Sequence, residues 1–351
     1  MTSVDFLAGA LLVSLVMYSL LAGADYGAGF WDLMSGGPRQ QEQRQLIEEA
    51  IGPVWEANHV WLILMIVLLF SGFPDAFGSL CVGLAVPLFL ILLGIILRGC
   101  SFVFRSYFTG EKRTQLYWGR VFSVSSAMTP LFLGILVGGV SCGSVVVNGG
   151  VSANGFLTTW LLPFPIAVGI LALSLFAYLS ACYLAAEAES AELKGDFRIR
   201  GLVAGAVSFL LALATYATAG NSAVALRHGL SERPVAWLLE ACALGAMVAA
   251  LAGLWRRRFE QARIAAAMQV GLMVAAWGVA QYPYLIRPDV TITNSAAPNN
   301  VATALDIALG CGAVILIPSL AVLFIVFRGA GEARQVPQSG DQRACGPVTS
   351  I

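Results

Sequence analysis

Nine apolar segments, each about as long as a membrane-spanning helix, recur along this chain and constrain its fold more than any other feature. Of its 351 residues, 58% are hydrophobic and only 11% are charged, and the mean hydropathy is +0.80. Soluble domains carry about 25% charged residues, so the composition indicates an all-α polytopic membrane protein. The predicted spans are residues 5–33, 54–72, 79–107, 117–140, 158–186, 200–220, 235–255, 262–286 and 302–327.

These segments predict a single transmembrane helical domain over residues 1–328, because no link between them is long enough to form a soluble domain. Residues 329–351 are rich in Gly, Pro, Gln and Ser and predict a disordered cytoplasmic tail. Residues 38–51 form a polar link with apolar residues on one helical face, which predicts a short interfacial helix. The first segment has no basic residue before it, so it predicts a retained helix rather than a signal peptide.

The basic residues are sorted between the two sides of the predicted membrane. Three of the 20 Lys and Arg residues, Arg227, Arg233 and Arg287, fall in links on the side of the N-terminus, and the other 17 (20 minus 3) fall on the opposite side or near it. The positive-inside rule therefore places the N-terminus outside and the C-terminus in the cytoplasm, which requires an odd number of spans. The net charge of zero gives no argument for a nucleic-acid partner.

One acid, Asp25, lies near the end of the first span in the sequence G-A-D-Y-G-A-G-F-W-D. Gly23 and Gly27 are four residues apart, so another helix can approach the backbone closely on that face. Ionisable groups inside a bilayer are costly and usually face a protein interior or a polar pathway. Asp25 is therefore an acid held by a neighbouring helix in a packing motif, a proton or ligand site, or the exposed end of the helix.

The second span opens with G-P-V-W-E-A-N-H-V-W-L-I-L-M, which places Glu56 and His59 three residues apart on one helix face, with Asn58 close to it. Glu and His can relay protons when their surroundings shift their titration. The two residues can equally form a satisfied structural pair near the membrane interface, with Trp55 and Trp61 as aromatic anchors. Both interpretations follow from the residue types.

Groups that could bind a metal or haem, or act in catalysis, are sparse. The second histidine, His228, falls in an outer link, which argues against a haem held by His59 and His228. The seven cysteines form no C-x-x-C pair, so no metal site is predicted. No P-loop, dinucleotide fingerprint, H-E-x-x-H motif or nucleophile elbow occurs, so no catalytic residue is predicted in this chain. Glu240 and Asp306 are single acids in apolar segments, and Arg98 is a candidate counter-charge for one acid.

The motif D-Y-G-A-G at residues 25–29, followed by G-P-V-W-E-A-N-H-V-W-L at 52–62, resembles subunit II of the cytochrome bd-type quinol oxidases. The segment Q-Y-P-Y-L-I-R-P-D-V-T-I at 281–292 resembles the cyanide-insensitive branch of that family, as does A-L-G-C-G-A-V-I-L-I-P-S-L at 308–320. The resemblance extends over the whole chain in span count and loop pattern.

The resemblance implies two four-helix bundles plus a peripheral helix, and a heterodimer with subunit I in the bacterial inner membrane. The complex oxidises quinol and reduces dioxygen to water, and this chain is not catalytic alone. Haem b and haem d, or haem b in place of haem d, are ligated by subunit I, and subunit II stabilises the haem region and contributes to proton or oxygen access. A bound quinone and a small single-helix subunit are left open. The other implied partners are quinol, dioxygen and the lipid bilayer.

The resemblance also transfers to individual residues. Asp25 matches the acid of the family's first motif and Glu56 matches the acid of its second, where the better-known branch has Asp-Gly instead of Glu-Ala. Position 59 is usually not His in that branch, so no role transfers to His59. Trp61 matches a family tryptophan along the apolar route for oxygen. The residues predicted for the proton pathway or the interface are Asp25, Glu56 and His59, and those predicted for the oxygen route or packing are Trp55 and Trp61.

Two other functions compete with an oxidase subunit. A proton-coupled secondary transporter would use Asp25 and Glu56 as coupling sites. A purely structural partner would take no part in moving protons or oxygen. Haem absorption bands in the purified complex favour the oxidase, whereas an active, haem-free transporter would exclude it.

Overall fold

The computed structural model describes residues 2–107, 112–145, 147–148, 151–152 and 157–333. The side chain of Glu56 is outside that description, although its backbone is helical. The chain divides into two compact units, Met1–Ala302 and Thr303–Ile351, and each is described by itself. The predicted tail, 329–351, falls mostly outside the described residues, and the single domain predicted over 1–328 stays a prediction.

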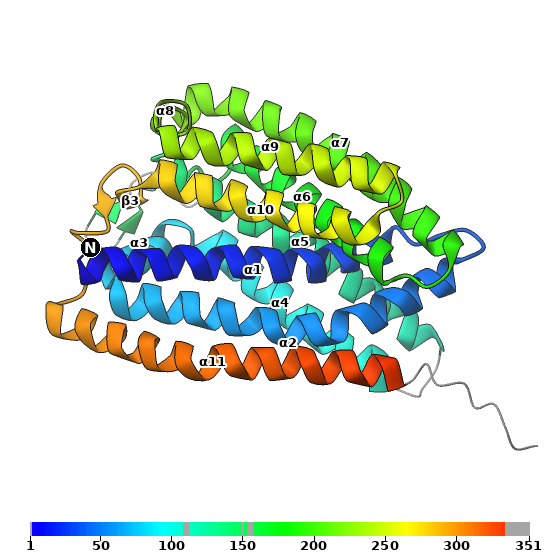
Figure 1. Cartoon of the computed structure of the whole chain (residues 1–351). Coiled ribbons are helices and arrows are strands. Elements are labelled where there is room, and N and C mark those ends of the chain that lie inside the picture. Colours follow the sequence, from blue (N-terminus) through cyan, green and yellow to red (C-terminus); the bar gives the residue numbers. More distant parts are fainter. Residues whose placement is uncertain (1, 108–111, 146, 149–150, 153–156, 334–351) are drawn as a thin grey trace, which may run out of the picture. The chain divides into compact units, whose positions relative to one another are not determined.

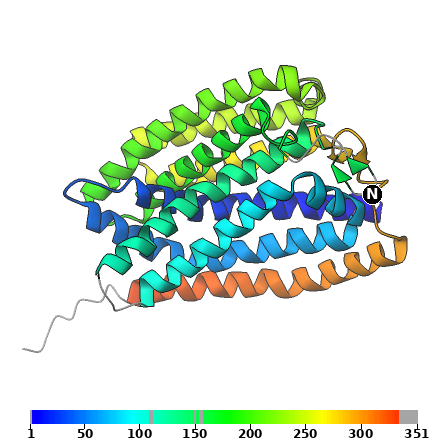
Figure 2. The same cartoon turned by 180° about the vertical axis from the view of Figure 1, so that it is seen from behind.

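The first unit is built from two four-helix bundles, which confirms the predicted all-α membrane fold (Figure 1). The first bundle contains α1 (Ser3–Leu33), α2 (Gln40–Gly72), α4 (Ala85–Tyr107) and α5 (Lys112–Ser141). The second bundle contains α6 (Pro163–Glu187), α7 (Ala191–Ser222), α9 (Pro234–Trp255) and α10 (Phe259–Gln281). Helices α1 and α5 both pack against α6 and thereby join the bundles, as the view from behind in Figure 2 also shows.

Within the described residues, eight helices are long and apolar enough to span a membrane, and a bent pair brings the number to nine. The bent pair consists of the last part of α2 and α3 (Pro74–Gly83), which meet at 111°. Pro74 explains the bend, because proline restricts the residue before it to non-helical backbone, and Phe73 has φ −137° and ψ 62°. The predicted span 79–107 is therefore wrong at its start, since α4 begins at Ala85.

The predicted interfacial helix at 38–51 is wrong as a separate element, because α2 continues without interruption from Gln40. Its apolar face does not lie on a membrane surface. Ile47 and Ile51 are 0% and 2% exposed and belong to a core cluster that includes Trp31 of α1 and Phe197 of α7. Burial in this core gives these isoleucines the apolar environment that the membrane was expected to supply.

Short elements gather at the end of the unit where α1 begins, here called the N-terminal end (Figure 1). The predicted span 262–286 ends earlier, at Gln281, and the chain then forms a hairpin. Arg287 in that hairpin donates from Nη2 to the carbonyl oxygen of Ala280 at 2.9 Å, which satisfies a carbonyl at the end of α10. The short elements are α8 (Val224–Glu232) and the antiparallel pairs β1 (Val147–Asn148) with β2 (Val151–Ser152), and β3 (Tyr284–Ile286) with β4 (Val290–Thr291).

The glycines of the first motif permit the contact between α1 and α6. A Cβ atom placed on Gly27 would lie 2.0 Å from the carbonyl oxygen of Phe176, a distance that no side chain tolerates. The close helix approach predicted from Gly23 and Gly27 is therefore confirmed, and the neighbour is α6.

The second unit contains most of α11 (Asn299–Ala333), which covers the predicted span 302–327. Its residues 299–316 are apolar enough to cross a membrane.

Candidate functional site

A buried acid, Asp25, lies at the centre of three helices of the first bundle. Its side chain is fully enclosed, and the residue as a whole is 1% exposed. Asn58 of α2 donates from Nδ2 to Asp25 Oδ2 at 2.6 Å, and Arg98 of α4 forms an ion pair with Asp25 Oδ1 through Nη2. We call Asp25, Asn58 and Arg98 the membrane cluster.

Arg98 is the largest fully buried side chain among the described residues and is 1% exposed. Its guanidinium carbon lies 4.9 Å from the ring centre of Tyr26 and 5.1 Å from that of Phe122, so aromatic faces surround the charge. A buried charge is tolerated only when it is paired and hydrogen-bonded. The structure therefore identifies Asp25 as the acid that Arg98 neutralises, a question that the sequence left open.

The glycine face and the acid face of α1 are different. Gly27 contacts α6, whereas Asp25 points to α2 and α4. Asp25 is thus held by neighbouring helices, as one of the predicted alternatives stated, but not across the glycine contact.

His59 does not hydrogen-bond to the membrane cluster. Its Nδ1 lies 2.7 Å from the carbonyl oxygen of Trp55, one turn earlier on α2, and its ring packs edge-on against the Trp55 ring at 5.5 Å. Because a carbonyl oxygen only accepts, Nδ1 carries the proton in this contact. Asn58, the residue before His59, makes the contact with Asp25 instead. The predicted side-chain pairing of Glu56 with His59 lies outside the described residues, because these do not include the Glu56 side chain.

The two predicted tryptophans pack inside the unit. Trp61 lies against a buried cluster that contains Tyr18, Tyr26 and Phe176. The Trp55 ring lies 5.4 Å from the ring of Phe102 on α4. Both side chains are partly buried, so their rings bridge helices.

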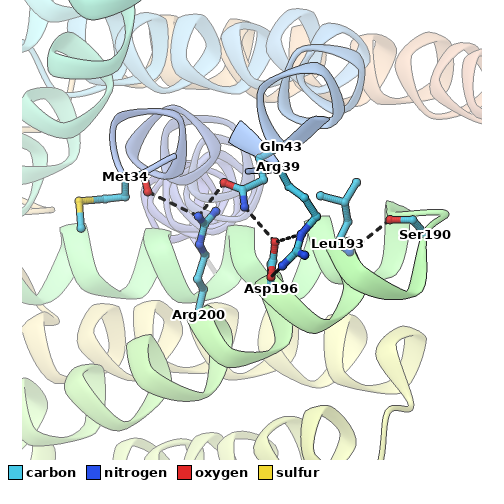
Figure 3. Close-up of polar contacts among 7 residues, drawn as sticks. All are labelled: Met34, Arg39, Gln43, Ser190, Leu193, Asp196 and Arg200. Carbon is cyan, nitrogen blue, oxygen red and sulfur yellow. Dashed lines mark hydrogen bonds and ion pairs between the residues drawn. The ribbon is translucent and has the colours of Figure 1, made fainter. Parts of the chain in front are cut away.

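A second polar cluster (Figure 3) lies where α1 ends and α2 begins, at the end of the first unit opposite the N-terminal end (Figure 1). Arg39 donates to both carboxylate oxygens of Asp196, at 3.0 and 2.5 Å, and Gln43 donates to Asp196 Oδ2 at 2.9 Å. Arg200 completes the cluster by donating to Gln43 Oε1 at 2.8 Å. Hydrogen bonding to Asp196 raises the pKa of the Arg39 guanidinium above its ordinary value. We call Arg39, Gln43, Asp196 and Arg200 the surface cluster; it ties the start of α2 to α7.

Sequence reasoning missed two members of the membrane cluster as site residues. Asn58 was noted only as a neighbour of Glu56 and His59, and Arg98 only as a counter-charge without a partner. A signal was present, because a lone Arg in an apolar segment requires an acid nearby. The choice among several acids needed the helix packing.

A family model described as cytochrome bd terminal oxidase subunit II matches residues 4–327. The chain belongs to the cytochrome bd terminal oxidase subunit II family. A putative cytochrome bd menaquinol oxidase subunit II of Bacillus subtilis is 26% identical over 325 residues, which cover 89% of this chain and 91% of that protein. Cytochrome bd-I ubiquinol oxidase subunit 2 of Escherichia coli is 23% identical over 344 residues, which cover 87% and 88%.

The fold agrees with this assignment. A chain in the structure of the bd oxidase from Geobacillus thermodenitrificans matches with a TM-score of 0.78 and 26% sequence identity, covering 93% of this chain and 99% of that chain. As a cytochrome bd subunit II, this chain is part of a terminal quinol oxidase, an oxidoreductase complex of the respiratory chain in the bacterial inner membrane. The oxidase interpretation is confirmed over that of a transporter.

A cytochrome bd complex contains haem, a partner subunit I and a quinol substrate. The two histidines of this chain lie on different helices, α2 and α8. His59 Nδ1 contacts the Trp55 carbonyl oxygen on α2, and the exposed His228 contacts Glu232 at 2.6 Å on α8. Within the described residues, no group of three or more His, Cys, Asp or Glu side chains could hold a metal ion.

Proposed function

We propose that this chain supports the haem-bearing subunit I and carries part of the proton route to the site of dioxygen reduction. The membrane cluster is the observation that carries the proposal. Asp25 is 1% exposed on a helix of 31 residues that is apolar enough to span the membrane. An acid in such a position is costly, and acids of this kind mark proton relays.

The proposed orientation places the N-terminus outside and the C-terminus in the cytoplasm. The distribution of the basic residues supports it, since only Arg227, Arg233 and Arg287 fall in links on the N-terminal side. With this orientation, the surface cluster faces the cytoplasm. Asp25, eight residues before the end of α1, lies about 12 Å from that end. Protons for water formation then reach Asp25 from the cytoplasmic side.

Four further residues complete the proposal. Glu56 is a second acid of the route, and His59 belongs to its lining or to the contact with subunit I. Trp55 and Trp61 line or pack the apolar route of dioxygen. Their partial burial between helices supports a place inside the subunit rather than at its lipid surface.

The haems, haem b with haem d or with a second haem b, take their axial ligands from subunit I in this proposal. Membership of the subunit II family supports that division. A bound quinone, a small single-helix subunit and membership of the cyanide-insensitive branch belong to the same proposal. When bound, the haems supply the electron transfer and the dioxygen chemistry. This chain conducts protons toward them and stabilises subunit I.

The proposal is tested by neutralising the acids in the assembled complex. Asp25→Asn combined with Arg98→Gln removes the carboxylate without leaving a buried charge unpaired, and Glu56→Gln removes the second acid. We expect the double variant to slow oxygen-dependent quinol oxidation about tenfold or more, and Glu56→Gln to slow it less. The haem absorption bands are measured in the same samples. Unchanged turnover in both variants contradicts a proton role, whereas lost haem bands indicate a structural role alone.

A further inference from the structure

Helix α1 carries a second buried acid, Asp32, that the sequence analysis did not single out. Asp32 is 1% exposed and follows Asp25 by seven residues, nearly two helical turns, so both acids lie on the same side of α1. The rise of a helix places them about 10 Å apart along the axis. Two enclosed acids therefore lie one behind the other on the last turns of α1.

A serine hydroxyl, Ser126 Oγ, contacts α1 between the positions of the two acids and donates to the carbonyl oxygen of Phe122 on its own helix at 2.7 Å. A Cβ atom placed on Gly29 would lie 2.2 Å from Oγ of Ser126 on α5, so this hydroxyl rests against the α1 backbone. Gly29 is four residues after Asp25 and three before Asp32, and Ser126 is 0% exposed. Because Gly29 has no side chain, the Ser126 hydroxyl can approach α1 at a position between Asp25 and Asp32.

A second serine, one turn earlier on α5, contacts the outer acid. Ser123 donates from Oγ to Asp32 Oδ2 at 2.5 Å and is 2% exposed. On the other side, Arg44 of α2 places Nε 3.6 Å from Asp32 Oδ1, and its side chain is 36% exposed. Asp32 is thus enclosed, yet it borders a residue that reaches solvent at the cytoplasmic end proposed above.

We propose that Asp32, Ser123 and Ser126, here called the polar ladder, form the cytoplasmic entrance of the proton route to Asp25. The inference rests on the proposed function of Asp25. A proton from water binds the Asp32 carboxylate and is released toward Ser126. Each serine hydroxyl accepts one proton and donates another by rotating, so its net charge is unchanged. The helical rise separates successive groups by about one turn, about 5 Å, so the proposed transfer requires a water molecule between them.

A structural role for the same residues is the competing explanation. In that case Ser123 and Arg44 only satisfy the buried carboxylate of Asp32, and proton movement does not depend on it. The two explanations differ in the solvent isotope effect on turnover. A structural contact does not change that ratio, whereas an impaired proton transfer raises it.

The test uses the complete complex with subunit I and measures oxygen-dependent quinol oxidation in H₂O and in D₂O. We expect Asp32→Asn to slow turnover about tenfold or more and to raise the isotope effect, with the haem bands retained. Asp32→Glu is expected to restore part of the rate, and Ser123→Ala to raise the isotope effect with a smaller loss of turnover. Asp196→Asn is the matched control, because it neutralises an acid at the same end but outside the ladder, and its turnover is expected to be unchanged.

The outcomes separate this inference from the proposed function. Full turnover in Asp32→Asn overturns the polar ladder; if Asp25→Asn with Arg98→Gln is slow, the proton role of Asp25 still stands. Full turnover in both variants overturns the ladder and the role of Asp25 together. If Asp32→Asn does not assemble, Ser123→Ala decides, and an unchanged isotope effect in that variant overturns the ladder.

Discussion

The membrane cluster and the surface cluster are built from the same chemical groups and differ in their access to water. Each joins an aspartate to an arginine and to an amide donor, Asn58 in one and Gln43 in the other. The paired side chains of Arg98 and Asp25 are 1% and 0% exposed, whereas those of Arg39 and Asp196 are 38% and 20% exposed. An Asp–Arg ion pair is therefore essential for stability in the membrane cluster and contributes only modestly to stability in the surface cluster.

The physical reason is the cost of leaving a charge alone. At the surface, water solvates whichever partner is left, and exposed ion pairs contribute about 0–1 kcal/mol. Inside the bundle, no such replacement is available, and breaking a buried pair costs about 3–5 kcal/mol. Variants that break one or the other ion pair therefore measure how strongly burial changes its contribution to stability.

Arg98→Ala is expected to lower the free energy of unfolding by about 3–5 kcal/mol, because it leaves the Asp25 carboxylate buried without a counter-charge. The loss is measured as a lower thermal midpoint and a lower yield of complex with intact haem bands. Combining Arg98→Met with Asp25→Leu removes both charges and is expected to recover much of the stability. A double variant as unstable as Arg98→Ala would contradict the argument, since packing rather than charge would then explain the loss.

The two amides form a matched pair for the second prediction. Asn58→Ala removes a hydrogen bond to a buried carboxylate and is expected to cost about 1.5–3 kcal/mol. Gln43→Ala removes the bond to Asp196 and the bond accepted from Arg200. Gln43 itself is buried, but water reaches the Asp196 carboxylate, so the expected cost is smaller, about 1 kcal/mol. Thermal unfolding of both variants measures the difference. Equal losses would mean that burial does not distinguish the clusters.

The smallest effect is expected for Arg39→Gln. It breaks the exposed pair with Asp196 and should cost about 0–1 kcal/mol. Salt screens such pairs, so the difference from the unmodified protein should shrink as the salt concentration is raised. A loss that is large and independent of salt would show that the surface cluster behaves like a buried one.

Much of the fold could be predicted because apolar length and loop charge are local signals. They gave the span count, and the motif glycines correctly predicted a close helix contact. The start of α4 was misplaced because hydropathy continues through the bend at Pro74, where backbone restriction rather than polarity ends the helix. The face of Ile47 and Ile51 was assigned to the membrane because a buried core and a lipid surface favour the same residues.

The site was less predictable, since its members come from different helices. Asp25 was identified from its costly position, but its pairing with Arg98 depends on how α1 packs against α4. Asp32 was overlooked because an acid near the end of a helix is ordinarily solvated, whereas Ser123 on α5 and Arg44 on α2 contact it and help to enclose it. Distances between helices are not encoded in the spacing along any one of them.

The contact between Gly27 and the carbonyl oxygen of Phe176 has a mechanical consequence. At Gly27 the backbones of α1 and α6 are too close for a side chain to fit between them, so one bundle cannot roll over the other unless the two helices move apart. Rocking of two halves, on which alternating-access carriers depend, is thereby opposed at this contact between α1 and α6. In the proposed route, protons would then pass through a frame that keeps its shape, by rotation of hydroxyl groups.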